Sequence, residues 1–172
     1  MSQGARFFWI CALTAGLFFV ALAVISKTTL EAEGMLIFDS RIFGYQAGPA
    51  REYLTWIAQT PDGVSTYLGT FRQLDTVFPV LLAIALSGGI WLNTFGSNPL
   101  RRGLLLGAPG AYLLMDLMEN AWVAEMLQTG VTVADQVIEQ ASTFTVMKWA
   151  LLFVSFLVLM NEWRRVRKKG AK

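Results

Sequence analysis

Residues 7–26 read FFWICALTAGLFFVALAVIS and contain no charged residue. A helix needs about 20 mostly apolar residues to cross the hydrocarbon core of a bilayer, so this stretch predicts a membrane span. The alternative interpretation is a cleavable signal peptide, whose apolar core is shorter, at about 7–15 residues. No small-residue cleavage site follows Lys27. We therefore interpret the stretch as a span that stays in the protein.

Three further apolar stretches of similar length predict three more spans, over about 76–94, 104–124 and 142–161. The composition agrees with this interpretation. Of the 172 residues, 55% are hydrophobic and only 15% are charged, whereas about a quarter are charged in a soluble domain. We predict an all-α, polytopic membrane protein, with residues 1–172 forming a single four-transmembrane-helix bundle.

Basic residues are distributed unequally between the two sides of these spans. One side collects nine Lys and Arg residues against one acid, and the other has four against nine acids. Because basic loops stay in the cytoplasm, both termini and the basic tail 162–172 are predicted to be cytoplasmic.

 We expect the bilayer to be a bacterial inner (cytoplasmic) membrane. The tail serves in this interpretation as a topogenic signal, and its alternative role is to bind anionic lipid or another polyanion.

Residues 27–75 predict a helical extracytoplasmic extension between the first two spans. Gly48-Pro49 favours a short helix that ends at Gln59, because proline suits the first turn of a helix. A second helix is predicted to start with Thr60 as its cap and Pro61 in its first turn, and to run into the second span. This long loop is interpreted as a lid over a ligand pocket or a docking surface, or simply as a cover for the bundle.

The second outer connection is short. Gly130 favours the end of the third helix, and Thr132 with Asp135 three residues later matches a capping box. The fourth helix is therefore predicted to begin near Val133, well before its apolar stretch.

Small residues recur every four positions in two of the spans. The third has Gly103, Gly107 and Ala111, and the first has Ala12 and Gly16. Such spacing lets the backbones of two membrane helices approach each other closely. We expect these residues to pack within the bundle, and a seam between two copies of the chain is the alternative.

Ionisable groups lie inside the third and fourth predicted spans. Asp116, Glu119 and Asn120 share one helical stripe with Tyr112, and Lys148 lies at a similar height on the fourth span. Charges at this depth are costly and usually functional. We predict a Glu119–Lys148 ion pair, with Asp116 and Asn120 completing a polar cluster that binds a ligand or a proton. The alternative is a salt bridge that only fixes the register of the helices.

Three further residues of the outer loop join the list of candidates. Asp75 is expected to close the polar cluster from its outer mouth. Asp39 and Arg41 lie in an apolar stretch of the loop and are expected in its roof or at the interface with the bundle.

The sequence excludes several kinds of chemistry. Cys11 is the only cysteine and there is no histidine, so an intrachain disulfide, a histidine-ligated metal or haem, and cysteine–histidine catalysis are ruled out. No phosphate-binding loop or nucleophile motif is present. We therefore assign no catalytic residue, metal or cofactor, and we expect no nucleic-acid partner.

Three functions remain open. The first is a non-catalytic accessory or oligomer-forming subunit that packs against other membrane proteins. The second is a protein that binds a lipid or a small hydrophobic ligand, or an isomerase-like enzyme that uses the intramembrane carboxylates. The third is a proton- or ion-coupled carrier. An open cavity that reaches Asp116 would favour the second, and a closed bundle with every charge paired would favour the first.

Overall fold

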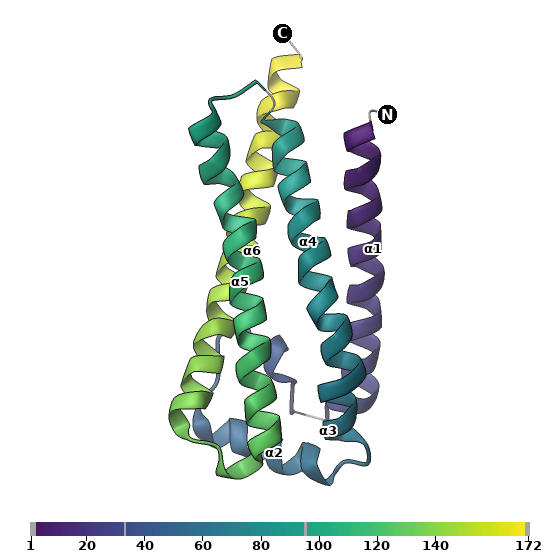
Figure 1. The fold of residues 1–172 in the computed structure, drawn as a ribbon, viewed down its shortest axis with the longest axis vertical. Helices are drawn as coiled ribbons and strands as arrows, with labels where there is room; N and C mark the ends of the chain where they lie inside the picture. The colour runs from purple at the N-terminus through teal and green to yellow at the C-terminus, as the bar shows by residue number, and fades with distance from the viewer. Residues whose placement is uncertain (1–2, 33, 95, 171–172) are drawn as a thin grey trace.

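The computed structural model describes residues 3–32, 34–94 and 96–170, and the named elements in these ranges are all helical. Four long helices lie along the long axis of the molecule: α1 (Gln3–Ile25), α4 (Arg72–Asn93), α5 (Pro99–Thr129) and α6 (Asp135–Gly170) (Figure 1). Both ends of the chain lie at one end of the bundle, here called the terminal end. The short helices α2 (Ala47–Gln59) and α3 (Gly63–Thr66) lie at the other, here called the α2 end.

Three described helical stretches are long and apolar enough to cross a membrane: Gln3–Leu30, Gly63–Asn93 and Asp135–Lys168. The predicted all-α fold is therefore confirmed, and three of the four predicted spans have a counterpart. α5 is not among the three. Its 31 residues are long enough, but its apolar run is interrupted by the polar residues near Asp116.

Two of the long helices are extended by π-helical turns. η1 (Ser26–Leu30) continues α1, and η3 (Tyr67–Phe71) joins α3 to α4 without a break. The predicted continuation of the loop helix into the second span is thus confirmed. The helix reaches well beyond its apolar part and forms one wall of the α2 end.

The predicted start of that helix was wrong. Thr60 caps the end of α2, because its hydroxyl donates to the Trp56 carbonyl at 3.1 Å and its backbone N–H donates to α2 carbonyls. Pro61 lies in the turn that follows, and Asp62 has a left-handed backbone with φ of 56°. The helix begins at Gly63, where a side chain would collide with Ile57 and Thr60.

The predicted capping box of the fourth helix was also wrong. Gly130 ends α5 with a positive φ of 69°, as expected, but a 3-10 turn, η4 (Gly130–Thr132), follows it. The Thr132 hydroxyl donates backward to the Thr129 carbonyl at 3.2 Å. α6 therefore begins at Asp135, two residues later than predicted.

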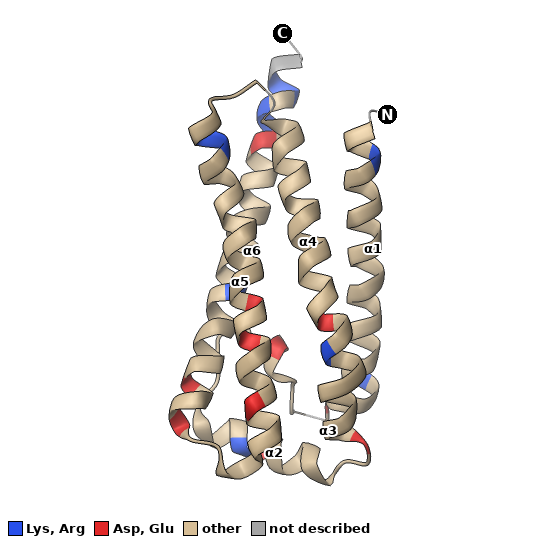
Figure 2. Cartoon of the chain, in the orientation of Figure 1, with Lys and Arg blue, Asp and Glu red and all other residues tan. Residues whose placement is uncertain are grey.

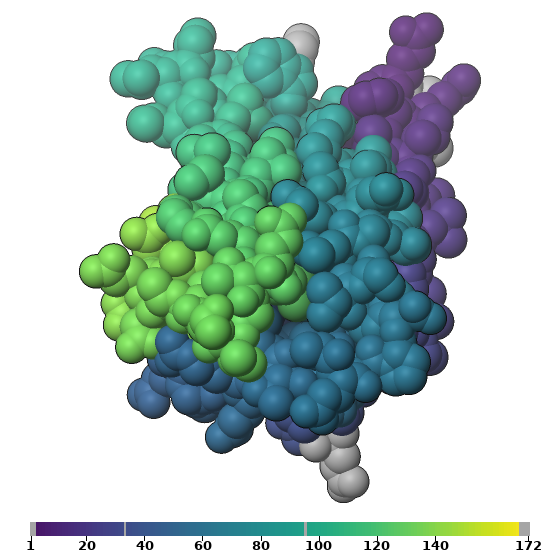
Figure 3. All heavy atoms as spheres, turned by 60° about the horizontal axis from the view of Figure 1, so that its bottom comes forward, coloured from purple at the N-terminus to yellow at the C-terminus, as the bar shows by residue number. Residues whose placement is uncertain are grey.

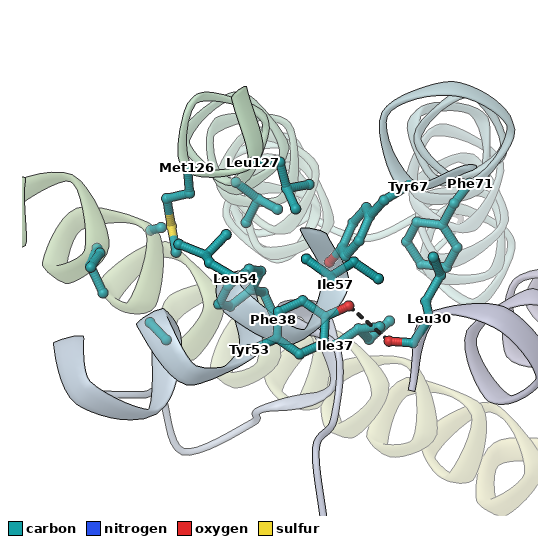
Figure 4. Packing of buried hydrophobic residues seen from close by; sticks show 14 of the residues in the cluster. Leu30, Ile37, Phe38, Tyr53, Leu54, Ile57, Tyr67, Phe71, Met126 and Leu127 are labelled. Carbon is teal, nitrogen blue, oxygen red and sulfur yellow. Dashed lines mark hydrogen bonds between the residues drawn. The ribbon is translucent and has the colours of Figure 1, made fainter. Parts of the chain in front are cut away.

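The α2 end has a hydrophobic core of its own (Figure 4). Phe38, Tyr53, Leu54 and Ile57 pack there against side chains from α5 and from the start of the α3–α4 helix. The Tyr53 hydroxyl donates to the Leu30 carbonyl at 2.8 Å. This core fixes the long loop against the bundle.

Polar contacts join α2 to the turn between α5 and α6. The Arg51 guanidinium donates to the Val133 carbonyl at 2.7 Å and pairs with Asp135 at 2.6 Å. A view of this end shows the atoms of α2 beside those of the α5–α6 turn (Figure 3). The loop and the helix ends therefore form one packed layer.

Charged residues are separated along the bundle (Figure 2). Basic residues gather at the terminal end, where Arg101 pairs with Glu162 at 2.5 Å. Most acids lie in the half nearer α2. Lys172, at the end of the basic tail, lies outside the described residues.

The glycines of α5 do not pack within the bundle, contrary to prediction. A side-chain carbon built at Gly103, Gly107 or Gly110 would meet nothing within 4 Å. Gly89 of α4 makes the close contact instead, because a side-chain carbon there would lie 2.8 Å from Leu159 and 3.0 Å from Phe8. α1, α4 and α6 therefore converge at Gly89, near the terminal end.

Candidate functional site

Lys148 of α6 lies at the centre of a buried charged cluster. Its ammonium pairs with Asp39 at 2.8 Å and with Asp116 at 3.3 Å, and it also contacts Glu119. The predicted Glu119–Lys148 ion pair is confirmed, and Asp116 joins it as expected. All four side chains are nearly inaccessible to solvent.

Neighbouring polar groups fix the α5 carboxylates in position. The Thr145 hydroxyl of α6 donates to Glu119 at 2.5 Å. The Asn120 amide donates to Asp116 at 3.3 Å and to the backbone carbonyl of Asp75 at 3.4 Å. The cluster thus ties α5 to both α4 and α6.

Asp39 enters the cluster from the loop before α2. It was expected in the roof of the bundle or at its interface, but its contact with Lys148 was not predicted. It lies in a 3-10 turn, η2 (Phe38–Ser40), that rests against α6. Tyr67 donates to its carboxylate at 3.0 Å, and the Trp149 indole donates to its backbone carbonyl at 2.9 Å. The available signal was an acid placed directly after the apolar pair Ile37–Phe38.

Arg41 does not join Asp39 in this cluster. Its guanidinium lies over the rings of Phe38, Tyr45 and Tyr53, at 5.1 to 5.4 Å from their centres. It also donates to the Leu36 carbonyl at 2.9 Å. Arg41 is therefore part of the packing of the loop, and it takes no part in the ion pairs of Lys148.

Asp75 is buried like the other three acids, with 7% of the residue exposed, but it does not contact Lys148. Within the described residues its carboxylate has neither a hydrogen bond nor an ion pair, and only its backbone carbonyl is bonded, by Asn120. The Asp75 side chain instead lines a cavity.

This cavity has a volume of about 710 Å³ and lies between α1, α4 and α6. Tyr112 and Asp116 of α5 also line it. Along α1 it extends from Phe8 to Ser26, which are 18 residues or about 27 Å apart. Its walls are mostly aliphatic and aromatic, and Asp75, Asp116 and Lys148 lie together at the end nearer α2.

The small residues of α1 line the cavity, contrary to the predicted helix contact. Ala12, Ala15 and Gly16 all face it, and a side-chain carbon at Gly16 would meet nothing within 4 Å. Small side chains here leave an open slot because α1 packs mainly against α4 and much less against α6.

A second polar group lies where the cavity reaches the end of α1. Ser26 donates to Glu31 at 2.6 Å, and Lys27 pairs with the same carboxylate. Burial raises the pKa of Glu31, but the hydrogen bonds from Lys27 and Ser26 outweigh it and hold that pKa below its ordinary value. The charge of Glu31 is therefore already balanced by Lys27.

The charges of the central cluster do not balance. Four carboxyl groups, those of Asp39, Asp75, Asp116 and Glu119, face one ammonium in the described part of the chain. A buried charge is stable only when it is paired or neutralised. The site can therefore hold protons or a bound cation. Among the described residues, no group of acids, cysteines or histidines has the arrangement of a metal site.

No family model, curated protein or solved structure matches the chain. The function is therefore argued from the geometry of the cavity and of the charged cluster.

Proposed function

We propose that the chain is an integral membrane protein in which α1, α4, α5 and α6 all cross the bilayer. The burial pattern of α5 supports it as the fourth span. Asp116 and Glu119 face the interior, whereas Leu104 and Leu114 are 73% and 55% exposed. Ionisable residues of membrane helices usually face the interior in this way.

The basic terminal end supports a cytoplasmic location for both termini, because basic loops are retained on that side. In this orientation the α2 end is extracytoplasmic. Lys148 lies six residues beyond Ser142, where the apolar part of α6 begins, and so about 9 Å inside the hydrocarbon. The turn that carries Asp39 would then dip into the bilayer. Non-helical backbone is tolerated at that depth where it is buried in protein or lines a cavity.

The function supported best is the binding of one amphiphilic molecule, a lipid or a small hydrophobic ligand. The observation that carries this proposal is the cavity of about 710 Å³, with apolar walls and charged residues at one end. Ligand sites are typically apolar cavities of about 300–1,000 Å³ with a few placed polar groups. The apolar body of the ligand would lie in the slot along α1, with its polar group at Asp75 and Asp116.

The test is to purify the protein in mild detergent and to measure the amphiphiles that remain bound by mass spectrometry. Gly16→Phe places a ring in the slot, and Gly88→Phe is the control because it adds the same ring to α4, where a side chain meets nothing within 4 Å. We expect the wild type and the control to retain one enriched molecule that Gly16→Phe loses. Equal retention by all three would contradict the proposal.

A second candidate function, an accessory or oligomer-forming subunit, is favoured by one observation. The face of α5 that carries Gly103, Gly107 and Gly110 is exposed and has no neighbour within the described chain. Small residues of this spacing allow helices to associate in a bilayer. Gly107→Leu should then reduce association with a second copy or another membrane protein, measured by cross-linking in the membrane. Unchanged cross-linking would count against this role.

A further inference from the structure

One of the four carboxyl groups beside the cavity differs from the other three in its contacts. Asp39, Asp116 and Glu119 all contact the Lys148 ammonium, whereas the Asp75 carboxylate contacts no cation among the described residues. Asp75 is nevertheless more than nine-tenths buried and lines the cavity. A buried carboxylate of this kind can be satisfied by a hydrogen-bond donor that the ligand carries into the cavity.

We propose that the amphiphile carries a protonated amine, and that Asp75 accepts a hydrogen bond from its ammonium group. This inference rests on the proposed function and specifies the chemical class of the ligand. A single positive charge pairs Asp75 and reduces the excess of carboxylates around Lys148. An ammonium–carboxylate hydrogen bond in a site shielded from water is also among the stronger ones.

The surrounding side chains favour a cation in the same place. Phe71, Phe78, Tyr112 and Trp149 line the cavity together with Asp75. Aromatic faces attract ammonium groups, most strongly when water is excluded. An anionic head group would instead meet the carboxylates of Asp75 and Asp116, because the Lys148 ammonium is already surrounded by three acids.

The experiment compares three probes of equal chain length: dodecylamine, dodecanol and dodecanoate. Saturable binding of each labelled probe is measured at pH 7 on the full chain in nanodiscs of neutral phosphatidylcholine. Asp75→Asn keeps the shape of the side chain and removes its charge. Asp62→Asn is the matched control, because Asp62 is an exposed acid in the turn before α3.

We expect the wild type and Asp62→Asn to bind dodecylamine at least about tenfold more tightly than dodecanol, as one charge-assisted hydrogen bond provides. Asp75→Asn should lose this preference and keep its affinity for dodecanol, which also shows that the variant is folded. Equal binding of amine and alcohol by the wild type, tighter binding of dodecanoate, or a preference retained in Asp75→Asn would each overturn the inference. If no probe binds saturably to the wild type, the proposed function fails as well.

Discussion

Lys148 connects three carboxyl groups that come from α5 and from the loop before α2. Its replacement therefore leaves several buried acids without a counter-charge. Removal of one partner from a buried ion pair costs about 3–5 kcal/mol. We expect Lys148→Met to lower the thermal unfolding midpoint in detergent strongly.

Lys27→Met is the control for this prediction. Lys27 also pairs with a carboxylate, but its side chain is 68% exposed, so its loss should cost about 1 kcal/mol or less. If the two variants unfold at the same temperature, the cluster does not hold the helices together. The role of Lys148 would then have to be sought in ligand binding alone.

A substitution at Thr145 perturbs the cluster less than the loss of Lys148. Its hydroxyl donates to Glu119 at 2.5 Å, and Thr145→Val removes only this donor while keeping the shape of the side chain. We expect a loss of about 2 kcal/mol in the free energy of unfolding, because the acceptor is a buried carboxylate. Thr143→Val on the exposed face of α6 is the control, and it should change that free energy little. Equal effects of the two changes would contradict this account of Glu119.

The contacts between α5 and α6 were predictable from residue positions, because antiparallel neighbours place Glu119 and Lys148 at one height. The contact of Asp39 with Lys148 joins residues 109 positions apart, through a loop without regular pattern. Its partner depends on where the core of the α2 end holds the loop. Nothing in the local sequence specifies that placement.

The loop before α2 approaches α6 closely at Gly44. This residue has a φ of +80°, and a side-chain carbon there would lie 2.7 Å from the Ser142 hydroxyl. The Tyr45 backbone N–H donates to the same hydroxyl at 2.7 Å. Together with the core of the α2 end, this contact holds the loop that carries Asp39 against α6.

Gly44→Ala should therefore destabilise the protein by about 2–3 kcal/mol, from backbone strain together with the collision. Gly34→Ala is the control, because Gly34 has the same φ of +80° and no neighbour within 4 Å. It should cost only about 1 kcal/mol. Unfolding midpoints of the two variants in detergent provide the measurement. Equal losses would mean that the loop does not dock on α6.

Local sequence patterns predicted the helices correctly, but some of the predicted helix ends were wrong. Thr60 and Thr132 both have the residue type of a helix start, yet their hydroxyls bond backward to the preceding helical segment. A threonine hydroxyl can cap either end of a helix, and the packing of the turn decides which end it caps. The predicted continuation of the loop helix into the second span does not depend on such a cap, and it is present.

At the scale of the whole molecule, the proposed four crossings with cytoplasmic termini would place residues 65 and 131 outside and residues 98 and 166 inside. We expect Ser65→Cys and Val131→Cys, each made in a Cys11→Ser background, to react with an impermeant thiol reagent in intact cells. Asn98→Cys and Val166→Cys should react only after the membrane is opened. Labelling of Val131→Cys and Asn98→Cys from the same side would show that α5 does not cross.

The cavity could not be predicted from the sequence. Ala12 and Gly16 have the spacing of a tight helix contact, and whether they approach a helix or leave a space depends on where α1 packs. The unpaired state of Asp75 likewise depends on the arrangement of three helices and a loop. Both features decide the proposed function, and both arise only in the folded molecule.

The most direct test of ligand binding is photo-cross-linking in the cell. A photoreactive p-benzoylphenylalanine is placed either at Leu82, which lines the cavity, or at Ile84, which is 40% exposed on the outside of α4. After irradiation, the masses of the adducts are determined on the purified protein. We predict one discrete amphiphile at Leu82 and a mixture of bulk membrane lipids at Ile84. The same mixture at both positions would contradict a specific ligand site.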